Sequence, residues 1–367
     1  MTGTTLLNGR AADVSDIAAK VDRGERITCE DALRLLACPD LGELSRMADQ
    51  VRRRLHPEPV VTYIVGRNIN YTNVCWVRCK FCAFYRPPGD PEGYVLPDEE
   101  IFRKIQEMVD VGGIEILLQG GLNSTLKLDY FERLFREIKR RFPGTHLHAL
   151  SPAEVLYLAK MSRLSVRDTL LRLRDAGMDT LPGAGGEILV DEVRQRIAFR
   201  KDTADEWIGV MRDAHSIGMR TSATMMYGSV ESLEDRVEHL RRIRDLQDET
   251  GGFTAFIAWN FQPDGTELAR EVAVRKTGAV DYLRTIATAR VFLNNIPNIQ
   301  ASWVTQGPKI GQISLSYGVN DFGSTMLEEN VVSAAGTTYR MTIEEIERLI
   351  RDAGYHPRRR NTLYQPV

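Results

Sequence analysis

Residues 68–82 read NINYTNVCWVRCKFC and place three cysteines, Cys75, Cys79 and Cys82, within eight positions. A short β-rich run comes first, and the cysteines follow it directly in the pattern C-x3-C-x2-C. In parallel α/β folds, the loops after the carboxyl ends of the strands build the active site. The stretch therefore predicts a thiolate site on the first such loop of a parallel α/β fold.

Three thiolates at this spacing suit several kinds of site. A structural zinc ion needs a fourth Cys or His, and the nearest histidines, His56 and His146, do not have zinc-finger spacing. A redox pair of Cys79 and Cys82 leaves Cys75 unexplained. Thiolates favour iron–sulfur clusters, and three of them hold three irons of a four-iron cluster while the fourth iron stays open to a ligand. We therefore favour an open four-iron cluster.

Outward from this stretch, β-rich runs alternate with helical patterns, which is typical of a parallel sheet covered by helices. This alternation predicts an α/β fold, a (β/α)8 TIM-type barrel that is either closed or partial. The last two predicted strands follow each other closely, so one helix is missing or very short between them. The predicted strands are 68–74, 114–120, 145–151, 179–185, 220–228, 252–261, 298–306 and 311–320.

Three regions are predicted along the chain. Residues 1–58 form a helical segment, in which Thr28 and Asp31 have the spacing of a helix-start pair. The same spacing predicts helix starts further along the chain at Ser151 with Glu154, Ser165 with Asp168, Thr203 with Glu206, and Ser232 with Asp235. Residues 59–330 form the barrel, after the breaker sequence HPEP at 56–59. Residues 331–367 add a helix and a tail, and the run Arg358-Arg359-Arg360 predicts that this tail is solvated.

Composition and charge narrow the function classes. The 367 residues include 48 Lys+Arg and 50 Asp+Glu, a net charge of −2, which excludes a protein acting mainly through a basic field on nucleic acid or membrane lipid. Five cysteines are an odd number and form no disulfide framework, and Cys29 and Cys38 are expected to be structural or incidental. No signal-peptide pattern or membrane-length apolar run is present. We therefore predict a cytoplasmic protein, whose near-neutral charge suits an enzyme with a small-molecule substrate as well as many other soluble proteins.

The cysteine motif, with Phe81 directly before its last cysteine and a barrel strand before its first, resembles that of the radical S-adenosylmethionine (SAM) superfamily. The resemblance implies a [4Fe–4S] cluster held by Cys75, Cys79 and Cys82. It also implies bound SAM, whose methionine moiety chelates the open iron. In that superfamily, reductive cleavage of SAM gives a 5′-deoxyadenosyl radical that abstracts hydrogen from the substrate. The electron comes from a reductant such as flavodoxin or ferredoxin.

The same resemblance implies a set of cofactor-binding residues. The end of the second strand, with its Gly-Gly pair, is expected beside the amino group of the methionine moiety, although Leu122 stands where the superfamily usually has an acid. An acid after the fourth strand is expected at the ribose hydroxyls. Of Arg200 and Lys201, we select Arg200 as a partner for the methionine carboxylate. The implied cofactor residues are Phe81, Gln119, Gly120, Gly121, Glu187 and Arg200, with Met226 and Tyr227 at the adenine.

Longer segments narrow the resemblance to the enzymes of the menaquinone futalosine pathway and the related deazaflavin (FO) synthase subunits. These segments are NINYTNVC at 68–75, LLQGGLN at 117–123, ATMMYG at 223–228 and GVNDFGSTMLEENVVSAAG at 318–336. Tyr71 and Tyr85, predicted to bind substrate, fit best with the branch that cyclises dehypoxanthine futalosine. The implied reaction abstracts hydrogen from the ribose C4′ and forms a C–C bond to the benzoate ring. An aminofutalosine synthase or a deazaflavin synthase-like enzyme is the alternative.

Such a reaction needs a proton acceptor and groups that contact the substrate. His148, Asp321 and Glu328 are the candidates for the proton acceptor by position. Asn320 is expected at the active-site end of the last strand, with Ser316 and Ser314 on the same face by strand alternation. Asn320 and Ser316 are therefore predicted to contact the substrate hydroxyls.

Overall fold

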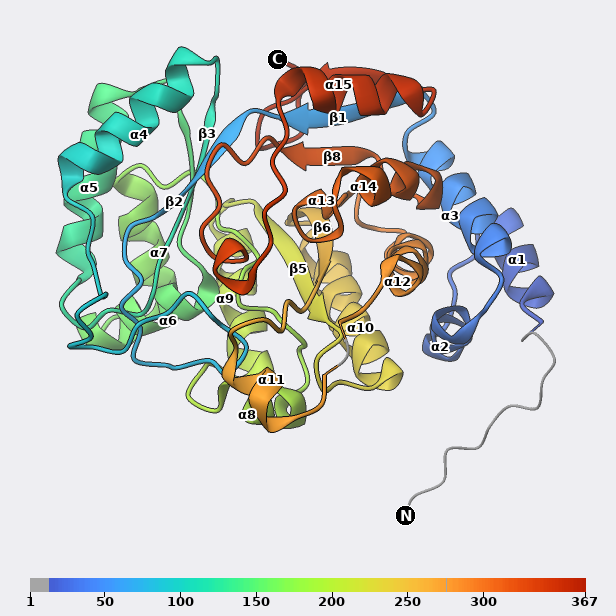
Figure 1. Ribbon diagram of the computed structural model, residues 1–367, viewed down its shortest axis with the longest axis horizontal. Coiled ribbons are helices and arrows are strands. Elements are labelled where there is room, and N and C mark those ends of the chain that lie inside the picture. Colours follow the sequence, from blue (N-terminus) through green and yellow to red (C-terminus); the bar gives the residue numbers. More distant parts are fainter. Residues whose placement is uncertain (1–12, 275) are drawn as a thin grey trace.

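The computed structural model describes residues 13–274 and 276–367, so the first twelve residues of the predicted N-terminal segment lie outside it. Parallel strands form the centre of the molecule and helices cover them (Figure 1). The strands are β1 (Val60–Ile64), β2 (Gly66–Asn70), β3 (Glu115–Gln119), β4 (His146–Ala149), β5 (Thr221–Tyr227), β6 (Phe253–Asn260), β7 (Asn298–Gln300), β8 (Asp321–Ser324) and β9 (His356–Arg359).

The strands pair in two parallel sheets, with the orders β5-β6-β7-β8-β1-β9 and β2-β3-β4. Two points join the sheets. Strand β1 runs into β2 through Val65, and single bridges at Thr180 and Leu181 connect β4 to β5. The result is a partial TIM-type barrel, which confirms the predicted fold class. The predicted strand 179–185 is reduced to those two bridges.

Helices flank the barrel on its outside (Figure 1). Predicted helix starts are confirmed at Thr28, Ser151, Ser165, Thr203 and Ser232, each of which accepts a hydrogen bond from a backbone N–H three residues on. The helices are α1 (Ser15–Asp22), α2 (Cys29–Ala37), α3 (Leu41–Leu55), α4 (Asp98–Asp110), α5 (Leu128–Arg141), α6 (Pro152–Ser162), α7 (Val166–Asp175), α8 (Asp191–Ala198), α9 (Ala204–Ser216), α10 (Leu233–Thr250), α11 (Glu267–Glu271), α12 (Ala279–Phe292), α13 (Trp303–Gln306), α14 (Pro308–Ser314) and α15 (Ile343–Asp352).

The prediction for the last two strands is wrong. Residues 311–320 are not a strand: α14 begins at Pro308, and a short 3-10 helix follows it. A proline at the first helical position has a backbone angle suited to a helix and no N–H to leave unpaired, so it starts a helix well. The predicted strand 298–306 ends at Gln300 and gives way to α13, so α13 and α14 are the connection that was expected to be missing.

The prediction of a solvated tail is also wrong. Residues His356–Arg359 form β9, which pairs in parallel with residues 60–63 of β1. The next residue, Arg360, turns inward and is buried, where it forms an ion pair with Asp321. The end of the chain therefore contributes to the barrel wall. The run of three arginines is not uniformly exposed, because alternate residues of a strand point to opposite faces.

Candidate active site

The cysteine loop follows β2 and folds back on itself. The Cys75 N–H donates to Arg86 O (2.9 Å), and the Arg86 N–H donates to Asn73 O (2.8 Å). A tight turn then joins the last two cysteines, with the Cys82 N–H donating to Cys79 O (3.1 Å). These bonds hold the loop over the carboxyl end of β2, the position predicted from the sequence.

The three cysteines line one cavity of about 200 Å³ at this end of the barrel. Burial raises the pKa of the Cys79 and Cys82 thiols, while the Lys201 ammonium opposes this shift. A metal that binds the Cys79 and Cys82 thiolates would have to displace their protons. Six further residues predicted from the sequence line the same cavity, namely Phe81, Tyr85, Gln119, Gly120, Gly121 and Glu187.

The three cysteines come from one loop and line one cavity. Among the described residues, no three His, Cys, Asp or Glu side chains are placed to hold a single metal ion. Each cysteine of a four-iron cluster binds a different iron, so the cluster does not need three ligands around one metal ion. The positions of Cys75, Cys79 and Cys82 are therefore compatible with the predicted cluster.

Gly120 and Gly121 pack directly against the cysteine loop. A Cβ atom added to Gly121 would lie 2.3 Å from Val74 O and 2.8 Å from Cys75 Cβ. A Cβ atom on Gly120 would lie 2.7 Å from the ring of Tyr71. The absence of side chains lets the end of β3 touch the backbone that carries Cys75, which explains the glycine pair.

We expect Gly121→Ala to lower the free energy of unfolding by about 1–3 kcal/mol, because the extra methyl group must displace backbone. It should also lower the iron bound after anaerobic reconstitution, since Cys75 is pushed from its place. Gly144→Ala is the matched control, because no atom lies within 4 Å of its added Cβ. Urea unfolding and iron analysis measure both effects, and equal results for the two variants would contradict the prediction.

Glu187 is buried at the cavity wall and paired with Lys201. The Lys201 Nζ lies 2.7 and 2.8 Å from the two carboxylate oxygens, and Arg194 lies 3.6 Å away. Burial alone would lower the pKa of Lys201, but Glu187 and Cys79 raise it overall. Glu187 has a positive φ of 33°, an uncommon conformation outside glycine, so its side chain is held here against a backbone cost.

The structure places Arg200 outside the cavity, contrary to its selection, and Lys201 at the cavity wall. Arg200 is exposed and lies over the ring of Phe199 outside the cavity. Lys201 lines the cavity, with its ammonium 5.6 Å from the ring centre of Phe81. The two residues are neighbours in sequence, so the sequence pattern contained no signal for which one turns inward.

Tyr71 does not line the cavity, contrary to its predicted role in substrate binding. It is 1% exposed, and its hydroxyl donates a hydrogen bond to Glu154 Oε1 (2.6 Å). Glu154, third residue of α6, does line the cavity and was predicted only as a helix-start residue. A signal was present, because Glu154 lies five residues after β4, at the carboxyl end of a strand.

A second cavity, of about 250 Å³, occupies the barrel interior. It adjoins the cysteine cavity, since Gln119 and Ala184 line both. His148 points into it from β4, as predicted, and its Nδ1 is bonded to Thr180 Oγ1 (2.7 Å). Burial, with His146 and Arg360 nearby, lowers the pKa of His148 to about 3. The imidazole is therefore neutral at pH 7 and a weak proton acceptor.

The positions predicted for Asn320, Asp321 and Ser316 are wrong. Strand β8 begins at Asp321, so Asn320 and Asp321 lie at the end of the barrel opposite the cysteines. Asn320 Oδ1 accepts from Arg290, and Asp321 is fully buried with Arg360. Ser316 is exposed in the short 3-10 helix, and strand alternation does not apply to it or to Ser314.

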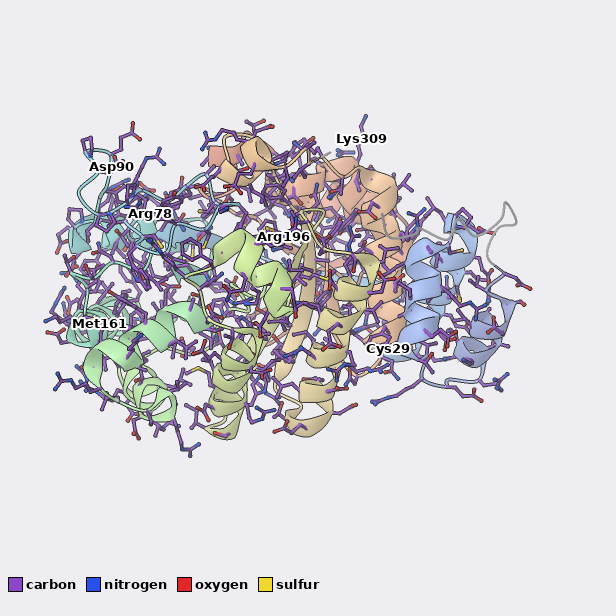
Figure 2. All side chains as sticks on the ribbon, turned by 90° about the horizontal axis from the view of Figure 1, so that it is seen from below. Cys29, Arg78, Asp90, Met161, Arg196 and Lys309 are labelled. Carbon is purple, nitrogen blue, oxygen red and sulfur yellow. The ribbon has the colours of Figure 1, made fainter. Side chains whose placement is uncertain are left out.

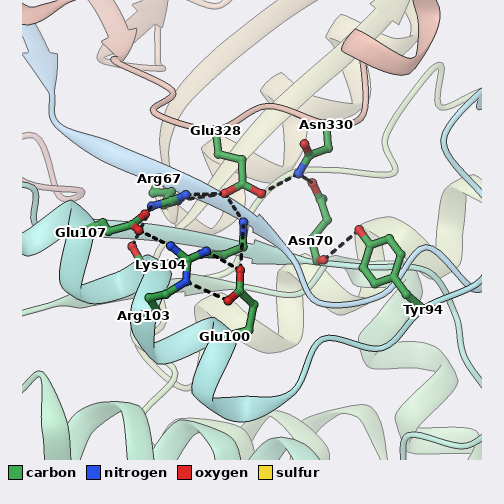
Figure 3. Close-up of polar contacts among 9 residues, drawn as sticks. All are labelled: Arg67, Asn70, Tyr94, Glu100, Arg103, Lys104, Glu107, Glu328 and Asn330. Carbon is green, nitrogen blue, oxygen red and sulfur yellow. Dashed lines mark hydrogen bonds and ion pairs between the residues drawn. The ribbon is translucent and has the colours of Figure 1, made fainter.

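Glu328 belongs to a network of charges beside the barrel mouth (Figure 3). Its carboxylate lies 2.8 Å from Arg67 and 2.6 Å from Lys104, and it accepts from Asn330 at 2.8 Å. Burial by itself would raise the pKa of Glu328, but the hydrogen bonds from Lys104, Asn330 and Arg67 lower this pKa overall. Glu328 is not one of the described residues that line the two cavities. Glu328 is linked to the cysteine cavity through Asn330, whose side chain also donates a hydrogen bond to Asn70, a residue that lines this cavity.

Met226 and Tyr227 are fully buried in β5. Neither is among the described residues that line the two cavities, so the structure does not place them beside a ligand. The Met226 N–H donates to Glu187 O (3.1 Å), and the ring of Tyr227 packs under Arg236. Both therefore support the site from the core.

Two protein-family models match the chain. Residues 69–243 match the model of the radical SAM superfamily, and residues 250–367 match the CofH/MqnC C-terminal region. Two curated relatives cover 96% of the chain. The first, from Halalkalibacterium halodurans, is 50% identical over 95% of its own length, and the second, from Streptomyces coelicolor, is 44% identical over 89%. The chain is a radical SAM enzyme of the CofH/MqnC family.

Both relatives are named cyclic dehypoxanthine futalosine synthase. Among solved structures, the FeFe-hydrogenase maturase HydG from Carboxydothermus hydrogenoformans has the same fold, with a TM-score of 0.76 over 96% of this chain and 80% of its own. Its 16% identity supports the fold alone. Membership of the radical SAM superfamily implies SAM and a [4Fe–4S] cluster. None of the described helices has the length and apolar character needed to span a membrane.

Proposed function

We propose that this radical SAM enzyme cyclises dehypoxanthine futalosine in the futalosine route to menaquinone. The observation that carries the proposal is the 50% identity, over nearly the whole of both chains, to a relative named cyclic dehypoxanthine futalosine synthase. When bound, the cluster and SAM together supply the 5′-deoxyadenosyl radical that takes hydrogen from the ribose C4′ of the substrate. The closing C–C bond to the benzoate ring then releases a proton and an electron, which restores the aromatic ring.

The residues of this chain would divide the work between the two adjoining cavities. Cys75, Cys79 and Cys82 would hold the cluster, and Glu187 would accept the ribose hydroxyls of SAM. The interior cavity would hold the substrate, because it adjoins the cysteine cavity at Gln119 and would exclude water from the reacting atoms.

Within that interior cavity, the neutral His148 would bind substrate as a hydrogen-bonding group. Its low pKa makes it unsuited to take the final proton. At the other cavity, the part-exposed Tyr85 would lie near the entrance.

Product analysis tests the reaction. The reconstituted enzyme, with SAM and a strong reductant, should convert dehypoxanthine futalosine to a product lighter by the abstracted hydrogen atom and the released proton. One 5′-deoxyadenosine should form per product. Turnover of an aminofutalosine or deazaflavin precursor, with dehypoxanthine futalosine unchanged, would contradict the proposal and assign the chain to a sister reaction.

The role of Glu187 has its own test. We expect Glu187→Gln to weaken binding of 5′-methylthioadenosine by on the order of tenfold to a hundredfold, because a neutral amide replaces a charged acceptor of the ribose hydroxyls. Arg200→Ala is the control and should change the affinity by less than about twofold, since its side chain is exposed outside the cavity. Calorimetric titration of the holoenzyme measures both. Unchanged affinity in Glu187→Gln would refute the assignment.

A further inference from the structure

Glu154 is a buried carboxylate in the cysteine cavity to which no part of the proposed reaction gives a role. It is 4% exposed and lies at the start of α6, behind the glycine pair that ends β3. Its Oε1 accepts from the Tyr71 hydroxyl (2.6 Å) and the Gly120 N–H (3.1 Å), and its Oε2 accepts from the Ser151 hydroxyl (2.6 Å). Every partner is a donor, so the surroundings are built for an acceptor at this point.

The charges around the cavity leave Glu154 without a cation. Of the described residues that line this cavity, Glu154 and Glu187 are the carboxylates and Lys201 is the cation. Lys201 lies against Glu187 and forms no ion pair with Glu154. A carboxylate removed from water without a cation is costly, and burial raises the pKa of Glu154 to about 7. The cavity therefore has a place for one positively charged group beside Glu154.

The position of Glu154 ties it to the cysteine loop. Its carboxylate is bonded to Gly120, and the adjacent Gly121 touches the backbone at Val74 and the Cβ of Cys75. The residue after the glycine pair is Leu122, which offers no carboxylate. The acceptor at this end of β3 thus comes from the first turn of α6, the helix that follows the neighbouring strand, β4.

We propose that Glu154 receives the amino group of the methionine moiety of SAM. The proposal rests on the proposed function, since it needs SAM in the cysteine cavity. In free SAM this group is an ammonium; a nitrogen that binds a metal ion gives up one proton and keeps two N–H donors. A carboxylate is a strong protein acceptor for the N–H groups of either form. Glu187, already paired with Lys201, remains for the ribose hydroxyls.

Glu154→Gln tests the proposal, because glutamine keeps the size of the side chain and one oxygen acceptor but removes the charge. The probes are S-adenosylhomocysteine and its desamino analogue, in which hydrogen replaces the amino group. In anaerobic calorimetry of the holoenzyme, we expect the variant to bind S-adenosylhomocysteine on the order of tenfold to a hundredfold more weakly. Binding of the desamino analogue should change by less than about threefold.

Glu99→Gln is the matched control, because Glu99 is 78% exposed on α4, and it should alter neither affinity. Equal losses for both probes would overturn the proposal and make Glu154 a structural residue that caps α6. Unchanged binding of S-adenosylhomocysteine would overturn it as well. If the wild-type holoenzyme binds neither probe, the proposed function itself fails, which is a separate result from a loss confined to the variant.

A second measurement tests the proposal on the wild-type chain, in case Glu154→Gln does not fold or does not retain iron. A crystal structure of the wild-type holoenzyme with S-adenosylhomocysteine should place the amino nitrogen within about 3.2 Å of a Glu154 oxygen. An amino nitrogen bonded to Glu187, or only to backbone carbonyls, would overturn the proposal.

Discussion

Cys79→Ala should abolish the iron–sulfur cluster and reduce 5′-deoxyadenosine formation to background, while the chain stays folded. The wild-type chain should hold about four iron atoms after anaerobic reconstitution, because three thiolates bind three irons and leave one open to SAM. With one thiolate removed, too few ligands remain to hold the cluster. Iron analysis, the visible absorption of the protein and product assays measure the loss, and circular dichroism measures the fold.

Cys29→Ala is the control for this experiment. Cys29 lies on α2, and Figure 2 places it far from Arg78, which stands between Cys75 and Cys79 in the cysteine loop. Its iron content and activity should equal those of the wild-type chain. If Cys79→Ala instead unfolds the chain, the metal is a structural element. If it keeps its iron, the cluster is held elsewhere.

Arg360→Met should lower the free energy of unfolding by about 3–5 kcal/mol, because it leaves a buried carboxylate without its cation. Asp321 is fully buried, and its oxygens lie 2.5 and 2.8 Å from the Arg360 guanidinium. Thr62 adds a hydrogen bond to the same carboxylate (2.5 Å). Asp321 therefore joins three parts of the barrel wall: its own strand β8, Arg360 directly after β9, and Thr62 in β1. Loss of the ion pair should loosen this side of the barrel.

Arg358→Met, two residues away on β9, is the matched control. Arg358 is 47% exposed and pairs with Glu58, itself 69% exposed, so its replacement should cost less than about 1 kcal/mol. Urea unfolding of both variants measures the difference. Equal costs would show that the buried pair contributes no more than an exposed one. Replacing Asp321 by leucine as well should recover part of the loss, because no unpaired charge then remains.

Much of the fold could be predicted from local patterns. Helix-start pairs such as Thr28 with Asp31 and Ser232 with Asp235 form as predicted, because a capping hydrogen bond joins residues three apart and needs no distant partner. Long strands such as β5 and β6 were also located correctly. The errors fall where tertiary contacts override a local pattern. Residues 311–320 become a helix and turn, and the basic tail pairs with β1.

The candidate site shows the same division. The cysteine site could be predicted from the sequence, because three ligands within eight residues lie on one loop whatever the rest of the chain does. The glycine pair and Glu187, which follow predicted strands, were also indicated. Three features could not be predicted: that Lys201 and not Arg200 lines the cavity, that Asp321 lies at the start of β8, away from the cysteines, and that Glu154 lines the cysteine cavity. These residues come from distant parts of the chain, and their positions depend on how the strands pair and the helices pack, which no local pattern contains.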